Sequence, residues 1–376
     1  MSMLASRRTA VDLARVRDAL TAVHDPEIGR PLAELGMLGE ISDRRGRVRV
    51  EVRLTTEDCP LAAEIRHAVT TVVAGLDDVR EVEVAFTSIP PRERAELAER
   101  IRREAPPLTA GLGTGGTPVY AVVSGKGGVG KSTVTANLAV ALAAEGRRVG
   151  VLDADVWGYS MPQLFGVRRN PVVLGELMMP VPAHGVGLMS IGFFVDEEQP
   201  VVWRGPMLHK ALHQFVTDTY WGALDALLID MPPGTGDATL SLLEFLPDTT
   251  LIAVTTPQTT ARLVATRVAR MAAQSGVGIS GVVENMSAAV CARCGEQSSI
   301  FGAGGGAQLA EEAGAPLLGH VPLDVELREA GDAGTPVVTA APESASAQEL
   351  ARIARNLPTP RRSLAGRALP LSVVSS

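Results

Sequence analysis

The chain has 376 residues, enough for two or three domains with buried cores, and its 46% hydrophobic and 20% charged residues are typical of a globular protein. Its net charge of −7 argues against a nucleic-acid-binding protein that works through bulk electrostatics, and no apolar run reaches the ~20 residues of a membrane span. The N-terminus lacks the apolar core of a secretory signal and only three cysteines are present, so we expect a cytoplasmic protein without a disulfide scaffold.

Residues 9–104 are predicted to form a small α+β domain. Apolar residues at helical spacing favour helices over 9–23 and 59–76. Alternating apolar and polar residues favour half-buried strands over 47–55 and 79–87. The expected order of elements is therefore helix, strand, helix, strand.

The central part of the chain is predicted to be a doubly wound α/β domain. Residues 105–117 are rich in Pro, Gly and Thr and are predicted to form a flexible linker. Over residues 118–357, short apolar runs alternate with helical stretches, which is typical of a mostly parallel sheet covered on both faces. Strands are expected at 119–124, 147–155, 225–233, 249–257 and 278–286. Residues 358–376 have no clear period and are predicted to be a disordered tail.

A phosphate-binding loop is predicted between the first strand of this domain and the next helix, which makes the fold class that of a P-loop NTPase. The sequence VSGKGGVGKST fits the pattern G-x-x-x-x-G-K-[ST]. Lys131 is expected to reach the β- and γ-phosphates of a nucleotide, Ser132 to ligate Mg²⁺, and backbone N–H groups to line the phosphates. The expected nucleotide-binding residues of the loop are Gly125, Lys126, Gly127, Gly128, Val129, Gly130, Lys131, Ser132 and Thr133.

Acidic residues end two further predicted strands. Asp153 and Asp155 lie in DADVWG, and Asp230 lies in DMPPGTGD. Such folds bind ligands at the carboxyl ends of their strands, so Asp230 is expected to hold the water shell of Mg²⁺, and a loop glycine, Gly234, to contact the γ-phosphate. One acidic strand end is more often a helix cap or a turn. Two of them in the same sheet as a phosphate loop favour a nucleotide site.

The phosphate loop carries a second lysine, Lys126, whose side chain is expected to project away from the bound phosphates. For an arbitrary phosphate loop, a solvated lysine is the simpler interpretation. GKGGVGKST, however, resembles the deviant loop of the ParA/MinD/nitrogenase-iron-protein group. The resemblance implies that Lys126 acts in trans on the nucleotide of a partner subunit, with ATP bridging a homodimer. It also implies that Asp155 orients the attacking water, that Asp153 lies nearer the metal, and that Asn285 reads the adenine edge.

Two cysteines spaced as CARC, Cys291 and Cys294, supply two of the four ligands that Zn²⁺ or an iron–sulfur cluster needs. Two copies of the chain related by a twofold axis would supply four. The residues leave four interpretations open: a shared [4Fe–4S] cluster, a structural Zn²⁺ between chains, a redox dithiol, and two inert surface thiols. The shared [4Fe–4S] cluster is favoured, because an exposed site between subunits suits delivery better than structure.

A run of motifs between residues 118 and 341 resembles the Mrp/ApbC-type iron–sulfur carrier ATPases. It includes DADVWGYSMP, VVWRGPMLHKAL, LIDMPPGTGDATL, VENMS, CxxC and FGAGGGAQLA, in the order of that family. Residues 9–104 resemble a PaaD-like iron–sulfur-assembly domain through DPEIGRPLAELGML and TTEDCP. Cys59 of TTEDCP is expected to serve packing, or to act as an assisting ligand if a helix N-terminus lowers the pKa of its thiol.

The resemblance implies an ATP-hydrolysing cluster carrier. We expect a slow ATPase that uses ATP and Mg²⁺, binds a [4Fe–4S] cluster between two copies of the chain and passes it to apo-proteins. Two alternatives remain: a ParA/MinD-like positioning ATPase that binds a membrane or DNA, and an electron donor similar to the nitrogenase iron protein. The first would need a basic face or a terminal amphipathic helix, and the second takes its cluster cysteines singly from two loops. We therefore expect neither a nucleic-acid partner nor a membrane partner.

Overall fold

The structure is a computed structural model that describes most of the chain. The described residues are 11–56, 59–104, 117–195, 205–234, 239, 242–243, 246, 249–258, 270, 272–273, 276–291 and 293–359. Residues 105–116 of the predicted linker and 360–376 of the predicted tail lie outside them. None of the helices in the described ranges combines the length and the apolar character that crossing a bilayer requires.

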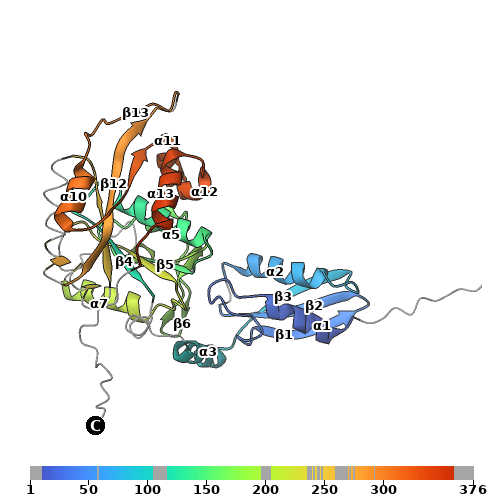
Figure 1. Cartoon of the computed structure of the whole chain (residues 1–376). Coiled ribbons are helices and arrows are strands. Elements are labelled where there is room, and N and C mark those ends of the chain that lie inside the picture. Colours follow the sequence, from blue (N-terminus) through green and yellow to red (C-terminus); the bar gives the residue numbers. More distant parts are fainter. Residues whose placement is uncertain are drawn as a thin grey trace, which may run out of the picture.

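The N-terminal part of the chain builds a three-stranded sheet with helices (Figure 1). Its elements are α1 (Leu13–Ala19), η1 (Leu20–Ala22), β1 (Leu38–Arg44), β2 (Arg47–Leu54), α2 (Ala62–Ala74), β3 (Glu81–Ser88) and α3 (Pro91–Glu104). The strand order is β1-β2-β3, with β1 antiparallel and β3 parallel to β2. The two helices and two strands predicted from periodicity are all present.

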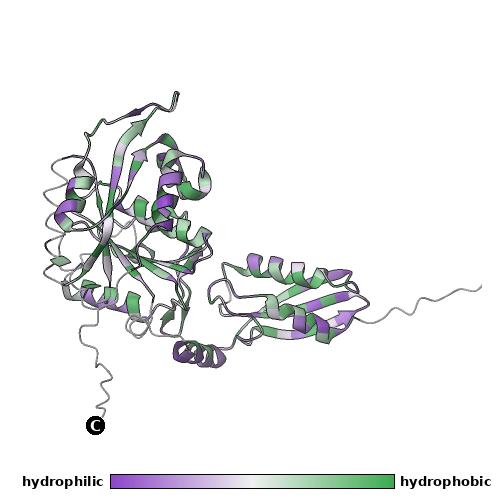
Figure 2. Cartoon of the chain, in the orientation of Figure 1, coloured by the Kyte–Doolittle hydropathy of each residue, from purple (hydrophilic) through white to green (hydrophobic). Residues whose placement is uncertain are grey.

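Two elements of this part, β1 and α3, were not predicted. In β1 only Ile41 is buried, so the strand lacks a clear alternation of apolar and polar residues. Helix α3 is charged along most of its length, and Figure 2 colours it hydrophilic. Its three buried side chains are Leu97, Ala98 and Ile101, which form a narrow apolar stripe. Both elements depend on contacts that a short window of sequence does not contain.

The second part of the chain forms the predicted α/β domain. Its elements are β4 (Val119–Ser124), α5 (Lys131–Ala144), β5 (Val149–Asp153), α6 (Met161–Leu164), β6 (Val173–Leu174), β7 (Leu177–Met178), β8 (Val181–Ala183), β9 (Val186–Ser190), η2 (Ile191–Phe193), α7 (Gly205–Thr217), β10 (Ala226–Asp230), β11 (Thr250–Thr255), β12 (Gly278–Val290), β13 (Gln297–Ser298), α10 (Gly305–Ala313), β14 (Leu317–Leu323), α11 (Val325–Ala333), α12 (Val337–Ala340) and α13 (Ala345–Arg355). The five predicted strands are β4, β5, β10, β11 and β12.

Apart from β6 and β7, which pair only with each other, the strands of this domain form one mostly parallel sheet. Its order is β13-β12-β11-β4-β10-β5-β9-β8, with β14 paired to β12. β8 and β13 run antiparallel to their neighbours, and the other pairs are parallel. The expected fold class, a doubly wound P-loop NTPase domain preceded by a small α+β domain, is confirmed.

Strand β4 shows why the central strands read as continuous apolar runs. Tyr120 and Val122 pack in the core beneath α5 and α13, where Leu138 is fully buried. Val119 and Ala121 face the opposite way, into the core that α7 and α10 cover. Successive residues of a strand point to opposite faces, so a strand with two covered faces has no polar side. This strand ends at the phosphate loop and fixes the position of its first residue.

Helix α3 lies between the two parts of the chain, and its buried residues share one apolar cluster with the N-terminal sheet and the β6–β7 hairpin (Figure 1). Its buried residue Ile101 belongs to the same apolar cluster as Leu174 and Leu177 of the β6–β7 hairpin. Around this cluster, Arg102 of α3 pairs with Glu176 at 3.1 Å and Asp218 at 3.2 Å. The hairpin therefore shares apolar contacts with the N-terminal sheet as well as with its own domain.

The variant Ile101→Ala is expected to lower the free energy of unfolding by about 2–4 kcal/mol, because it removes a fully buried side chain and leaves a cavity. Urea denaturation followed by circular dichroism measures the change. The control is Glu99→Ala on the exposed side of α3, which is expected to change stability by less than about 0.5 kcal/mol. Equal stabilities of the two variants would contradict the packing of α3.

Candidate functional site

The phosphate loop joins β4, which ends at Ser124, to α5, which begins at Lys131. Gly128 and Gly130 both have φ of +79°, a left-handed conformation that glycine adopts without strain. A Cβ at Gly130 would also overlap the side-chain nitrogen of Asn285. Gly128 and Gly130 are therefore needed for the local conformation of the loop, before any ligand is considered.

A cavity of about 680 Å³ lies over this loop and the first turn of α5. The backbone and side chains of the loop form one wall. The facing walls come from other elements and consist of Asp155, Trp157, Gly158, Ser160, Leu164, Leu208, Pro232 and Pro233. Trp157 is 70% exposed, so the rim of the cavity carries an unusually open aromatic side chain. Trp157 and the two prolines stand in motifs that the sequence singled out, but no role had been predicted for them.

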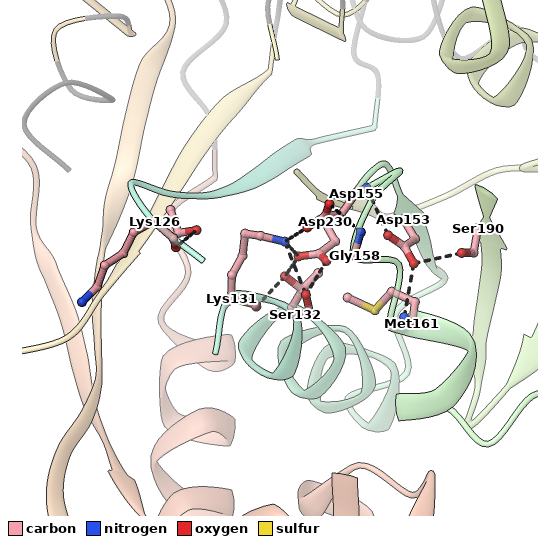
Figure 3. A network of polar contacts seen from close by, with 11 residues as sticks. Lys126, Lys131, Ser132, Asp153, Asp155, Gly158, Met161, Ser190 and Asp230 are labelled. Carbon is pink, nitrogen blue, oxygen red and sulfur yellow. Dashed lines mark hydrogen bonds and ion pairs between the residues drawn. The ribbon is translucent and has the colours of Figure 1, made fainter. Parts of the chain in front are cut away.

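The carboxylate of Asp230, at the end of β10, is the centre of a polar network (Figure 3). The Lys131 ammonium lies 2.7 Å from Asp230 Oδ1, and Ser132 Oγ donates a hydrogen bond of 2.6 Å to Oδ2. Thr135 Oγ1 donates to Oδ1 at 3.1 Å. Thr135 was missed from the sequence, although it lies one helical turn after Lys131 and shares its face of α5. The three residues expected to hold phosphate and Mg²⁺ are thus brought together.

Asp155 faces this network from the loop after β5. Its Oδ2 lies 3.7 Å from the Lys131 ammonium, and its Oδ1 accepts a hydrogen bond of 3.2 Å from the Gly158 N–H. Burial raises the pKa of Asp155, the charge of Lys131 opposes that rise, and the nearby charge of Asp230 adds to it. Among the described residues that line the cavity, Asp155 is the one carboxylate.

Asp153 lies beneath the cavity and does not line it. Its Oδ2 accepts hydrogen bonds from Ser190 Oγ at 2.9 Å and from the Met161 N–H at 3.2 Å, and its Oδ1 accepts from the Asp155 N–H at 3.2 Å. Burial raises its pKa to about 7, and the negative charge of Asp230 contributes. These bonds shape the loop that presents Asp155. The expectation that Asp153 lies nearer the metal than Asp155 stays a prediction, and this geometry gives it no support.

Lys126 points away from Lys131, as expected from the sequence (Figure 3). Its ammonium donates a hydrogen bond of 3.0 Å to Gln258 Oε1, in the loop after β11. Its own carbonyl accepts from Ser124 Oγ at 3.0 Å. Gln258 was missed, because nothing in the sequence near it signals a partner for a distant lysine. The side chain of Lys126 therefore has a defined position at the edge of the phosphate loop.

Asn285, on β12, borders a second cavity of about 260 Å³ beside the phosphate loop. Its Nδ2 donates to the Val129 carbonyl at 2.8 Å, while its buried Oδ1 has no hydrogen-bond partner. A buried acceptor without a partner is costly, and a ligand N–H can satisfy it. Gly130 and Thr133 line the same cavity, so a ligand on the phosphate loop can extend into it.

Gly234 lies in the loop after β10 and has φ of +91°. Its N–H donates a hydrogen bond of 2.9 Å to the Ser124 carbonyl at the start of the phosphate loop. The neighbouring residues 235–238 lie outside the described ranges. The contact of Gly234 with a γ-phosphate stays a prediction.

The two cysteines of CARC are exposed and lie in the turn between β12 and β13. The Cys291 N–H donates to the Glu296 carbonyl at 2.9 Å, and the Gly295 N–H donates back to the Cys291 carbonyl at 2.8 Å. Backbone N–H groups of Arg293 and Cys294, together with the Cys294 thiol, lower the pKa of Cys291. A lowered pKa favours the thiolate, the form that binds metals. Within the described residues, no three His, Cys, Asp or Glu side chains are grouped so that they could hold one metal ion.

Cys59 is half-buried in the N-terminal domain. Burial is the main cause that raises the pKa of its thiol, and the carboxylates of Glu27 and Asp25 raise it further. The Leu61 N–H, at the start of α2, lowers it by a smaller amount. Cys59 packs against the apolar cluster of this domain, as the packing interpretation expects. The condition for a ligand role, a thiol pKa lowered by the helix N-terminus, is not met, because burial outweighs that effect.

Comparison with known families gives two matches. Residues 117–358 match the family described as NUBPL iron-transfer P-loop NTPase. Residues 13–85 match the family described as iron-sulfur cluster assembly protein.

Curated relatives match over nearly the whole chain. The iron-sulfur cluster carrier protein of Mycobacterium leprae is 44% identical, with 97% of each chain covered. The protein of the same name from Mycobacterium tuberculosis is 46% identical and covers 95% of this chain and 96% of its own. Among solved structures, a nucleotide-binding protein from Archaeoglobus fulgidus in complex with ADP is 36% identical, with a TM-score of 0.51. The match covers 64% of this chain and 89% of that one.

The variant Asp153→Asn is expected to change how stability depends on pH. The pKa of Asp153 is raised from 3.8 to about 7, so between these values the folded chain keeps a proton that the unfolded chain has released. Rising pH across this window therefore destabilises the native protein, and the variant escapes that loss. Urea denaturation at about pH 5 and about pH 7.5 measures it, with exposed Asp77→Asn as the control. If the free energy of unfolding of Asp153→Asn differed from that of the native protein by the same amount at both pH values, the raised pKa of Asp153 would be contradicted.

Proposed function

Since the chain belongs to the family of NUBPL iron-transfer P-loop NTPases, we propose that it is an ATP-dependent carrier of [4Fe–4S] clusters. The cluster is the cargo, held between two copies of the chain and passed to apo-proteins. One observation carries the proposal: a single strand, β12, links the nucleotide site at Asn285 to the cysteine pair that begins at Cys291.

The phosphate loop and its neighbours fit ATP. The loop N–H groups and Lys131 would bind the phosphates, and the unpartnered Oδ1 of Asn285 would accept the amino group of adenine. Ser132 and Asp230 would hold Mg²⁺, because hydroxyl and carboxylate oxygens are the ligands that this ion prefers. When bound, Mg²⁺ neutralises charge on the β- and γ-phosphates.

Lys126 would complete the nucleotide site of a second copy. Its side chain turns away from the cavity of its own chain, in which Lys131 already provides the ammonium. In one copy it is bound to Gln258 at the edge of the loop, and it would leave that partner to reach a nucleotide across a face-to-face contact. There it would stabilise charge that develops on the phosphates, as an arginine finger does.

Asp155 would orient the attacking water. It faces the cavity close to Lys131, and the hydrogen bond from Gly158 holds its carboxylate in place. No second carboxylate lines the cavity among the described residues, so we expect slow hydrolysis. Slow turnover suits a nucleotide that switches a carrier between states, rather than one that drives repeated chemistry.

The exposed pair of Cys291 and Cys294 would hold half of a [4Fe–4S] cluster. Each chain supplies two thiolates, whereas the cluster needs four, so a second copy completes the site. The position of the pair in an exposed turn leaves the cluster open to a recipient protein. Such carriage belongs in a reducing compartment, and we place the protein in the cytoplasm.

The variant Lys131→Ala is expected to weaken ATP binding about 10–100-fold, because a charged hydrogen bond of about 1.5–3 kcal/mol is lost. Lys126→Ala is expected to bind ATP normally, but to lose ATP-dependent association and about 10³-fold in turnover. Titration calorimetry, light scattering and phosphate release measure these effects. Exposed Lys210, the third lysine of the sequence, provides the control Lys210→Ala. If Lys126→Ala still associated and hydrolysed ATP normally, the trans role would be wrong.

The double variant Cys291→Ser/Cys294→Ser is expected to lose the brown chromophore of anaerobically reconstituted protein, while ATP binding survives. Iron and sulfide content, with the absorption spectrum, measure the loss. The control is Cys59→Ser, which removes the remaining cysteine of the chain and is expected to keep the cluster. If the double variant retained iron and sulfide, the assignment of Cys291 and Cys294 as cluster ligands would be wrong.

A further inference from the structure

Strand β12 extends past the edge of the sheet at which its neighbour β11 ends. Its pairing with β11 ends at Glu284, opposite Thr255, the last residue of β11. The strand then continues through residues 285–290 and pairs with β13, and Figure 1 shows the two leaving the body of the domain together. At about 3.3 Å per residue, Asn285 and Cys291 are at most about 20 Å apart.

A bulge interrupts β12 directly after Asn285. The pairing with β14 passes from Asn285–Val321 to Ala289–Leu323, so the chain of β12 is longer than that of β14 between these pairs. Met286 lies in this bulge with φ of +56°, a left-handed conformation that is strained for a residue with a side chain. Bulges bend a strand and change its direction next to functional sites. The direction of residues 287–290 therefore depends on the conformation of Met286.

The side chain of Met286 forms part of the wall of the 260 Å³ cavity that Asn285 also borders. On the phosphate-loop side it approaches Gly130, where a Cβ would lie 3.9 Å from Met286 Cε. A base that enters this cavity would contact Asn285 and Met286, the two residues at the start of the bulge. Any adjustment of the Met286 side chain would act on a backbone that is already held away from its preferred conformation.

Beyond the bulge, the end of β12 and strand β13 form a hairpin over residues 287–291 and 293–298, which we call the cysteine hairpin. Its two strands pair at Ala289–Ser298 and Val290–Gln297. The hydrogen bond from the Cys291 N–H to the Glu296 carbonyl closes its turn. Ala289 of the hairpin also pairs with Leu323 of β14, which holds the hairpin at that point. Because its bonds tie the turn to both strands, a change of direction at Met286 tilts both cysteines together about that pair.

We propose that Met286 is a positioning residue that couples occupancy of the base cavity to the placement of the cysteine hairpin. The inference rests on the proposed function, since it requires that adenine enters this cavity and that the hairpin holds the cargo. A base seated against Met286 stabilises one arrangement of the bulge, and the empty cavity allows another. The chain thereby links the nucleotide state to the geometry of the cysteines through one strand.

Hydrogen–deuterium exchange of protein without iron or cluster, in the presence and absence of saturating ATP and Mg²⁺, tests the proposal. In the native chain, ATP is expected to change the exchange rate of amides in residues 287–298 by at least about fivefold. In Met286→Gly and Met286→Ala this change is expected to fall below about twofold, while ATP titration still shows binding. Met286→Leu keeps a long apolar side chain and is expected to keep the coupling.

The experiment includes a second variant and a glycine control. If Met286→Gly fails to fold, Met286→Ala still tests the proposal. The control for a glycine at a left-handed position is Arg45→Gly, because Arg45 has φ of +58° in the β1–β2 turn. A dimer contact that merely covered the hairpin would protect it equally in every variant. Equal ATP-dependent changes in the native chain, Met286→Gly and Met286→Ala would therefore overturn the proposal, as would no change in the native chain.

The same measurement separates this inference from the proposed function. Because the exchange experiment uses protein without a cluster, failure to bind a [4Fe–4S] cluster would appear in a separate iron analysis and leave the exchange result unaffected. If the chain bound a cluster but ATP did not change exchange in the cysteine hairpin, the role of Met286 would be wrong and cluster carriage would be unaffected.

Discussion

The structure of the site depends on one buried charge, the carboxylate of Asp230. A carboxylate without exposure to water requires partners, because the cost of leaving it unpaired in the core is several kcal/mol. The partners come from the first two turns of α5, through Lys131, Ser132 and Thr135. They bind the start of that helix to the end of β10, and β10 lies between β4 and β5 in the sheet. The phosphate loop and the loop of Asp155 are thereby placed on either side of the same carboxylate.

Much of this arrangement could be predicted from the sequence, because it follows from strand ends. Apolar runs with two covered faces gave the central strands, and the parallel order brought Lys131 near Asp230. Gln258 could not be found in this way, since its bond to Lys126 depends on the position of β11 beside β4. Strand β1 and helix α3 were missed for a related reason. Each has few buried side chains, which pack against residues elsewhere in the chain. The sequence of each element therefore shows only a weak periodicity of apolar residues.

The contrast between Asp153 and Asp155 shows where sequence reasoning about the site stops. Both are carboxylates at the end of β5, two positions apart, and a motif assigns both to the ligand. In the structure, Asp153 is bound from below by the hydroxyl of Ser190, on β9. That strand was not predicted, so the partner that holds Asp153 under the cavity could not have been anticipated. Asp155 lies beyond the end of the strand, where its largely buried carboxylate lines the cavity beside Lys131.

The parallel sheet also explains how one contact between two copies could complete two sites. β4, β11 and β12 run in the same direction, so the phosphate loop, Gln258 and Asn285 all follow or lie near carboxyl ends at one edge of the sheet. The cysteine hairpin leaves the sheet at that same edge, because it is the continuation of β12. A second copy that approached this edge would meet Lys126 and the cysteines together. The bulge at Met286 would then set how far the two pairs of cysteines lie from one another, which is the distance that a shared cluster must span.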